Sequence, residues 1–234
     1  MDTSAIQTRL ADVRARIARA AGRAKRDPAS ITLVAVSKTF SADYVRAVAA
    51  AGQVDFGENK VQEALQKMDA TSDLPLRWHL VGHLQSNKAK KAGARFDVVQ
   101  SVDGADLLRK LDESAATAGR SLQVLVQVDL AGEPTKHGTR EDGLLPIFEA
   151  AAHCRAARVS GLMIIPPAVD DPEDARPYFR ELKEVRDRLA ARGVDASMLS
   201  QLSMGMSHDF EVAVEEGATL VRVGTAIFGS RTYV

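Results

Sequence analysis

Residues 31–38 read Ile31-Thr32-Leu33-Val34-Ala35-Val36-Ser37-Lys38, an apolar run rich in β-branched residues that follows Asp27-Pro28. Such a run is typical of a strand that is buried on both faces of a parallel sheet. Lys38 comes at the carboxyl end of this strand, and two interpretations of it are open. Its stem could be buried while its amine reaches solvent. Alternatively, the amine lies in an apolar mouth, where burial would lower its pKa and prepare it to form a Schiff base.

Short apolar strands alternate with helical segments along the rest of the chain. The expected strands cover residues 31–38, 54–56, 76–81, 98–100, 122–130, 159–165, 198–202 and 220–223. The expected helices cover residues 4–26, 41–52, 58–68, 87–92, 103–119, 144–152, 175–189 and 210–216. This alternation in 234 residues predicts an α/β fold, a single (β/α)8 TIM barrel over residues 1–234 with an extra N-terminal helix. An open doubly wound sheet is the alternative, but no Gly-x-Gly-x-x-Gly follows the first strand.

Composition and charge exclude several classes of protein. The chain has 31 basic and 31 acidic residues and a formal net charge of +0, so no nucleic acid and no membrane is expected as a partner. The arginines of the first helix are expected to form a face that is exposed to solvent. Cys154 is the only cysteine, which excludes an intrachain disulfide. The N-terminus does not resemble a signal peptide and no apolar run could cross a bilayer, so a cytoplasmic location is expected.

Two glycine-containing loops follow the last two expected strands. Ser203-Met204-Gly205-Met206-Ser207 runs into a helix, and Gly224-Thr225-Ala226 follows the final strand. In barrels of this type, phosphate often binds to the loops after strands seven and eight. Glycine lets the backbone approach the anion there, and N–H and hydroxyl groups donate to it. Ordinary capped turns are the alternative. A strand-end lysine opposite a phosphate site fits pyridoxal 5′-phosphate (PLP), and it also fits a class I aldolase that acts on a sugar phosphate.

The remaining candidate residues leave alternatives open. Arg222 lies in the last strand, and a buried arginine needs a partner. It could donate to a ligand, or it could pair with a core acid such as Glu58 or Asp129. His79 and His83 flank the end of the third strand, but no matched carboxylate cluster accompanies them, so no metal site is expected.

Five stretches resemble those of a known family. They are Ala35-Val36-Ser37-Lys38-Thr39, Phe56-Gly57-Glu58-Asn59-Lys60-Val61-Gln62-Glu63, Trp78-His79-Leu80-Val81-Gly82-His83-Leu84-Gln85-Ser86-Asn87-Lys88, Leu202-Ser203-Met204-Gly205-Met206-Ser207 and Val221-Arg222-Val223-Gly224-Thr225-Ala226-Ile227-Phe228-Gly229. On these motifs the chain resembles the YggS/PROSC family of pyridoxal phosphate homeostasis proteins. The resemblance implies a single barrel similar to the N-terminal domain of alanine racemase.

The resemblance also implies a role for individual residues. Lys38 is expected to hold PLP as a Schiff base, with Arg222 on the ring side and the two loops on the phosphate. The cofactor-binding residues implied are Lys38, Asn59, Ser203, Gly205, Ser207, Arg222, Gly224 and Thr225. The stretch 129–134 departs from the more polar, asparagine-containing stretch of many relatives, which leaves the role of Asp129 open.

Two functions from different classes remain. Family members are regarded as carriers or regulators of intracellular vitamin B6 without established turnover, which implies PLP as the ligand and PLP-dependent apo-enzymes as partners. The alternative is an amino-acid racemase, which needs an acid/base on each face of the cofactor. The chain ends at Val234, soon after the last strand, so a second domain carrying the opposite base is not expected. His79, His83 or Tyr233 could replace that base, but nothing marks them, and no catalytic residue is predicted.

Overall fold

The computed structural model describes residues 2–132 and 137–229, and its sheet is a closed barrel of eight parallel strands. Each strand pairs with the next in the chain, and the last pairs with the first from Thr32↔Leu220 to Ala35↔Val223. The predicted barrel is therefore confirmed, and the open sheet is excluded because no edge strand remains. The strands are β1 Thr32–Val36, β2 Asp55–Glu58, β3 Arg77–Leu80, β4 Val98–Val102, β5 Leu122–Gln127, β6 Ala157–Met163, β7 Gln201–Ser203 and β8 Leu220–Val223.

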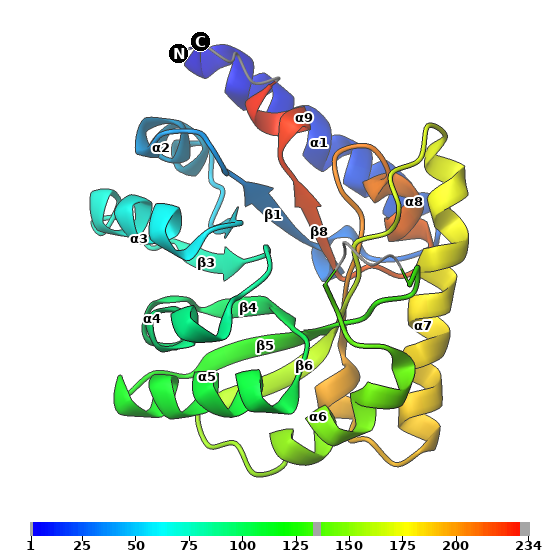
Figure 1. Ribbon diagram of the computed structural model, residues 1–234. Helices are drawn as coiled ribbons and strands as arrows, with labels where there is room; N and C mark the ends of the chain where they lie inside the picture. The colour runs from blue at the N-terminus through cyan, green and yellow to red at the C-terminus, as the bar shows by residue number, and fades with distance from the viewer. Residues whose placement is uncertain (1, 133–136, 230–234) are drawn as a thin grey trace.

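Helices surround the strands on the outside of the barrel (Figure 1). They are α1 Thr3–Arg23, α2 Ala42–Ala50, α3 Val61–Ala70, α4 Ala89–Arg95, α5 Ala105–Thr117, α6 Leu144–Ala151, α7 Arg176–Ala191, α8 Phe210–Glu215 and α9 Thr225–Phe228. Each long helix buries an apolar stripe, which in α1 consists of Ile6, Leu10, Val13 and Ile17 on its packed face. None of the helices in the described part of the chain is long and apolar enough to cross a membrane.

The extra N-terminal helix is docked through its arginines, which are not merely solvated as predicted. Arg16 pairs with Glu211 of α8 at 2.9 Å, and its guanidinium lies 4.6 Å from the centroid of the Phe210 ring. Arg9 Nε donates to the carbonyl oxygen of Ile227 in α9 at 2.8 Å. Figure 1 shows α1 running along α8 and α9 beside the seam of β1 and β8. This face of α1 therefore covers the place where the barrel closes.

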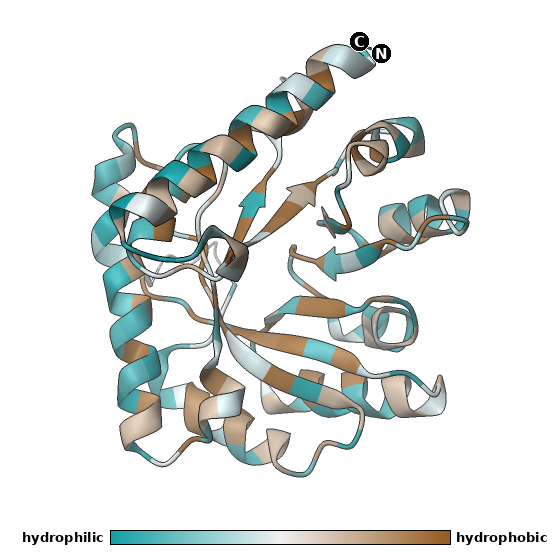
Figure 2. Ribbon diagram, turned by 180° about the vertical axis from the view of Figure 1, so that it is seen from behind, coloured by the Kyte–Doolittle hydropathy of each residue, from teal (hydrophilic) through white to brown (hydrophobic). Residues whose placement is uncertain are grey.

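Apolar side chains fill the barrel interior in one layer, separate from the larger core between strands and helices. The inner layer consists of Val34, Val98, Leu125, Met163 and Leu220. Figure 2 shows strands that are mostly apolar and helices in which apolar and polar residues are mixed along the ribbon. Side chains two residues apart on a strand share a face. A polar layer that includes Gln100 and Arg222 therefore follows, on the side of the carboxyl ends of the strands.

Several predicted elements have different bounds in the structure; the strand predicted over residues 122–130, for example, ends at Gln127. Glu58 is the last residue of β2 and not the start of a helix, because α3 begins at Val61. Met198 belongs to a 3-10 helix, Ala196–Leu199, and not to the following strand. Asp195 initiates that helix by accepting a backbone hydrogen bond, which competes locally with strand formation.

Candidate functional site

Lys38 lies beside the loop that follows β8. It is half-buried and comes two residues after the end of β1, at the carboxyl-end rim of the barrel. In the pairing of β1 with β8, Ala35 lies opposite Val223, so the chain leaving β1 runs next to Gly224. A Cβ on Gly224 would lie 3.2 Å from the carbonyl oxygen of Val36. Strand pairing thus brings the lysine and one predicted phosphate loop to the same part of the rim.

A buried cluster fixes the turn that carries Lys38. We call it the Lys67 cluster, and it consists of Lys67, Glu58 and Glu63. Lys67 Nζ lies 2.6 Å from Glu58 Oε1 and 2.7 Å from Glu63 Oε1. The same amine donates to the carbonyl oxygen of Ser37 at 2.7 Å. Ser37 Oγ in turn donates to Glu58 Oε1 at 2.6 Å. The residue before Lys38 is therefore held by both its backbone and its side chain.

The residue after Lys38 is held by the same cluster. Thr39 has a φ of 71°, in the left-handed region that β-branched residues avoid. Its N–H donates to Glu63 Oε1 at 2.5 Å. A strained backbone of this kind persists only where the surroundings hold it, and it is most common at functional sites. The turn around Lys38 is therefore built to a fixed shape.

Burial and hydrogen bonding compete at the two carboxylates of the Lys67 cluster. Burial raises the pKa of Glu58, and the hydrogen bonds from Lys67 and Ser37 offset this only in part. Burial also acts to raise the pKa of Glu63, but hydrogen bonds from Lys67 and Thr39 outweigh it and leave that pKa below its usual value. Glu58 Oε2 is buried without a hydrogen-bond partner in the described part of the chain. Glu63 therefore carries the negative charge more readily than Glu58.

Ser207 joins the two loops that the sequence predicts to bind phosphate. Its Oγ accepts from the Gly224 N–H at 3.1 Å and from the Ala226 N–H at 3.3 Å. A hydroxyl that accepts two hydrogen bonds still has its own proton to donate. Gly205 has a φ of 90°, and a Cβ there would lie 2.5 Å from Ala213 Cβ, so this loop needs glycine. The loops are therefore packed into one unit with a hydroxyl between them.

Arg222 points into the barrel, where its side chain is buried. Its Nη1 donates to Ser203 Oγ at 2.6 Å, and its Nη2 donates to the carbonyl oxygen of Ile164 at 2.8 Å. Among the described residues it pairs with neither Glu58 nor Asp129, the two acids considered from the sequence. Burial lowers the pKa of Arg222 to about 10, so the guanidinium keeps its charge at neutral pH. Among the described residues no carboxylate pairs directly with Arg222, although Asp209 acts to raise its pKa, and a buried cation of this kind favours an anionic ligand nearby.

A chain of hydrogen bonds crosses the barrel interior from Arg222. Ser203 Oγ donates to Gln100 Oε1 at 2.6 Å, and Gln100 Nε2 lies 2.9 Å from His79 Nδ1. His79 Nε2 lies 2.8 Å from Asp55 Oδ1. We call these five residues the interior chain. The Ser203 hydroxyl is used within it, and its predicted contact with phosphate stays a prediction.

His79 is part of the interior chain and is fully buried. Gln100 Nε2 can only donate, so His79 Nδ1 accepts and Nε2 carries the proton that Asp55 binds. Burial lowers the pKa of His79, and the hydrogen bond to Asp55 offsets this in part. The imidazole is therefore neutral, with both nitrogens occupied, which fits a structural role.

The other predicted site residues lie around the same rim. Asn59 is half-buried directly after β2, and a Cβ on Gly82 would lie 2.3 Å from its carbonyl oxygen. Thr225 is exposed as the first residue of α9. Tyr233, considered as a second base, lies outside the described residues.

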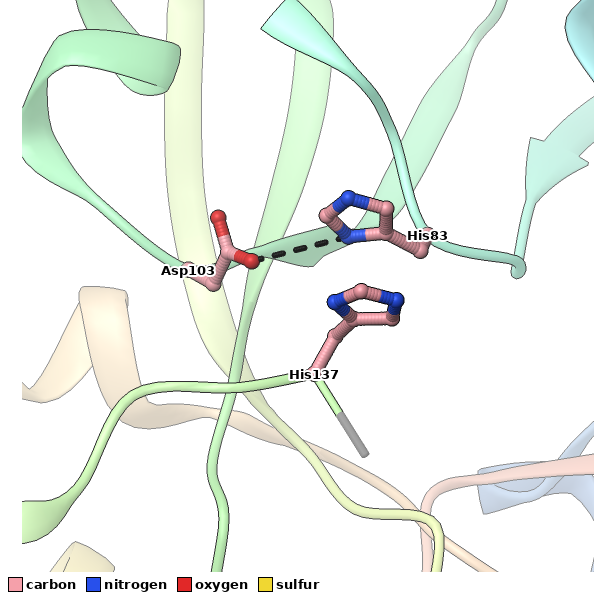
Figure 3. Close-up of side chains that lie close together, drawn as sticks. All are labelled: His83, Asp103 and His137. Carbon is pink, nitrogen blue, oxygen red and sulfur yellow. Dashed lines mark ion pairs between the residues drawn. The ribbon is translucent and has the colours of Figure 1, made fainter. Parts of the chain in front are cut away.

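One grouping differs from the sequence expectation that no carboxylate accompanies the histidines. Asp103 and His137 lie beside His83, at the ends of three successive strands (Figure 3). Their separation in the sequence hides this arrangement, because it is the pairing of β3 with β4 and of β4 with β5 that brings the three segments together. Its chemistry is developed below.

Lys67 and Gln100 have the clearest structural roles that the sequence analysis missed. Lys67 is only 6% exposed although it lies on a surface helix. Two signals were available: Glu63 lies four residues before it, and the apolar stripe of α3 includes its neighbours Ala64 and Met68. Gln100 lies in the fully buried strand β4, where an amide has to find partners inside the barrel.

Comparison with known proteins identifies the class of this barrel. A family profile described as "Alanine racemase, N-terminal domain" matches residues 5–232. Pyridoxal phosphate homeostasis proteins from Aquifex aeolicus and Pseudomonas aeruginosa are 43% and 42% identical to the chain. These alignments cover 96% and 98% of this chain and 98% and 97% of the relatives. The chain therefore belongs to the YggS/PROSC family of pyridoxal phosphate homeostasis proteins, as its motifs indicated.

A solved structure supports the same placement. PipY of Synechococcus elongatus, determined with PLP bound, is 39% identical and superposes with a TM-score of 0.84. The match covers 96% of this chain and 100% of that one.

Proposed function

We propose that this protein binds PLP and takes part in intracellular vitamin B6 homeostasis. In this proposal residues 1–234 act as one PLP-binding domain in the cytoplasm, and PLP-dependent apo-enzymes are the partners that receive the cofactor. The names of the homologues and the PLP-bound structure of PipY support the ligand. PLP would supply an electrophilic aldehyde and a phosphate dianion to the site.

The observation that carries the proposal is that Lys38 and the loop at Gly224 lie at the same part of the barrel rim. Lys38 Nζ would condense with the aldehyde to form a Schiff base and release one water. The Thr225 N–H and the hydroxyl of Ser207 would donate to the phosphate, while the Gly224 and Ala226 N–H groups hold the Ser207 oxygen in place. Gly205 fits this assignment because any side chain there would collide with Ala213. Asn59 and Ser203 complete the set proposed to hold the cofactor.

The charge of Arg222 supports an anionic ligand. Arg222 is the next-to-last residue of β8, and its buried guanidinium donates to two neutral groups, Ser203 Oγ and the Ile164 carbonyl oxygen. A dianion at the adjacent loop would offset part of the cost of burying this cation. Thr225, exposed at the start of α9, would add one hydroxyl donor.

We propose a carrier and not an enzyme. A racemase needs a second acid/base opposite the lysine, and His79 cannot serve because it is buried with both ring nitrogens bonded. His83 is partly exposed at the rim, but its ring stacks on His137 and its Nδ1 lies near Asp103. The Lys67 cluster also fixes the backbone on both sides of Lys38, which suits an anchor.

The covalent step is tested by reduction with borohydride followed by peptide mass spectrometry. We expect a yellow protein in which the pyridoxyl group is found on Lys38, and a colourless Lys38→Ala variant. Lys110→Ala, which removes an exposed helix lysine, should keep the colour. A wild type that stays colourless with added PLP would refute the cofactor assignment.

The carrier and the racemase are separated by two assays. Amino acids incubated with the protein in deuterated water should not exchange their α-proton at enzymatic rates, and rapid exchange would favour the racemase. Transfer of PLP to an apo-enzyme should be faster from the loaded protein than from the same concentration of free PLP. Equal rates would limit the role to storage and release.

A further inference from the structure

Three potential metal ligands meet at the barrel rim, contributed by the segments that follow β3, β4 and β5. They are His83, Asp103 and His137, which we call the rim triad (Figure 3). One ligand atom from each lies within 4.8 Å of the other two, and His83 Nδ1 lies 3.6 Å from Asp103 Oδ2. The two imidazole rings stack with centroids 3.5 Å apart and planes 10° from parallel. In Figure 3 one nitrogen of each ring lies on the side toward the Asp103 carboxylate.

We propose that the rim triad binds a divalent cation of the zinc type. Zinc binds nitrogen and carboxylate ligands at about 2.0–2.2 Å in tetrahedral geometry, which separates ligand atoms by about 3.4 Å. The distance of 3.6 Å between His83 Nδ1 and Asp103 Oδ2 is close to this value. His83 and His137 are exposed, so their rings have room to turn toward a shared ion. Two imidazoles and one carboxylate are a common ligand set for zinc with an open coordination position.

The backbone on either side of the triad is held in place. Ser101 Oγ donates to the carbonyl oxygen of Gly82 at 2.7 Å, which ties the residue before His83 to the end of β4 near Asp103. A side chain on Gly82 would collide with the Asn59 backbone, so glycine is needed for the two segments to pack this closely. These contacts fix the ends of two strands relative to each other, as support around metal ligands commonly does.

The third ligand has its own anchors. Gln127 Nε2 donates to the carbonyl oxygen of His137 at 2.6 Å from the end of β5. Thr139 N–H donates to the Gln127 carbonyl, and Asp129 N–H donates to the Thr139 carbonyl, both at 2.9 Å. The chain after His137 is therefore paired back onto the strand it came from, and His137 returns to the rim.

Bound metal would join the segment at His137 to the ends of β3 and β4. Three protein ligands leave at least one position for water or for an oxygen or nitrogen donor of a small ligand. The order of strands in the closed barrel places β3, β4 and β5 across the mouth from β7, β8 and β1. The rim triad is thus separate from the Lys38 site and does not depend on the proposed function.

The test is zinc titration of the chelator-treated full chain against a chromogenic competitor. We expect one equivalent of zinc to bind, with affinity lower by at least about 100-fold in His83→Ala and in Asp103→Asn, because each removes a direct ligand. His153→Ala and Cys154→Ser, which alter ligand-type side chains elsewhere, should bind as the wild type does. Cobalt substitution should give the d–d absorption of a four-coordinate site in the wild type and lose it in His83→Ala.

Circular dichroism of each variant would verify that it is folded. Because the triad residues are partly exposed, their replacement should leave the barrel intact. Absence of stoichiometric zinc binding by the folded wild type would overturn the proposal. Equal affinity in the wild type and both triad variants would do the same, since the metal would then be bound elsewhere.

Discussion

Lys67→Met should lower the free energy of unfolding by about 3–5 kcal/mol, the usual cost of removing one partner from a buried ion pair. Methionine keeps most of the length of the side chain, so packing on α3 changes little. The change removes contacts of 2.6 Å to Glu58, 2.7 Å to Glu63 and 2.7 Å to the Ser37 carbonyl. Glu58, whose side chain is 0% exposed, would keep only the hydrogen bond from Ser37. Most of the cost therefore comes from a carboxylate left buried without a cation.

The measurement is the unfolding of the PLP-free protein in urea, monitored by circular dichroism. Lys110→Met, on the exposed face of α5, should stay within about 0.5 kcal/mol of the wild type. Adding Glu58→Gln to Lys67→Met should cost less than the sum of the single changes, because the second change removes the stranded charge. The expected coupling is about 1–3 kcal/mol. A loss below about 1 kcal/mol for Lys67→Met, or additive single changes, would refute the buried-charge reasoning.

Two further predictions concern the rim and the interior chain. Thr225→Ala should weaken the binding free energy of PLP by about 1–2 kcal/mol, a factor of about 5–30 in affinity, if its exposed hydroxyl donates to phosphate. Equilibrium dialysis measures the affinity, with Thr117→Ala as the control. Equal affinity in Thr225→Ala and the wild type would remove the assignment. The pKa of His79 is lowered by burial, so below about pH 6.5 the unfolded chain binds a proton that the folded chain does not. The free energy of unfolding should therefore fall between about pH 6.5 and 5, by up to about 1.4 kcal/mol per pH unit. Urea unfolding across this range should show this dependence of the free energy of unfolding on pH in the wild type and in His153→Gln but not in His79→Gln. An unchanged pH dependence in His79→Gln would contradict the assignment.

The barrel could be predicted because its strands are short apolar runs separated by helical periodicity. The position of Lys38 followed directly, since it ends the first of these runs and parallel strands end at a common rim. The two glycine loops followed from their order in the chain. Their contact through Ser207 did not, because it depends on how the loops fold onto each other.

Polar residues inside the structure were predicted least well. Glu58 was placed at the start of a helix because glutamate is common there and rare at a buried strand end. Its cation, Lys67, lies on the next helix and is identified only when that helix packs on β2. For Arg222 the sequence left a ligand and a core acid as open alternatives. The partners found are Ser203 in β7 and the Ile164 carbonyl just after β6, which the pairing of β6, β7 and β8 brings near.

Because β1 pairs with β8, the part of the rim that contains Lys38 and Gly224 can form only after β8 has been synthesised. Lys38 is synthesised before Gly224, so a nascent chain that lacks β8 has no place where the two lie together. A ligand that needs both residues would bind only chains whose barrel has closed. Its binding would then favour the closed barrel by mass action. The supply of such a ligand would therefore influence how much of the newly made protein reaches and keeps its folded state.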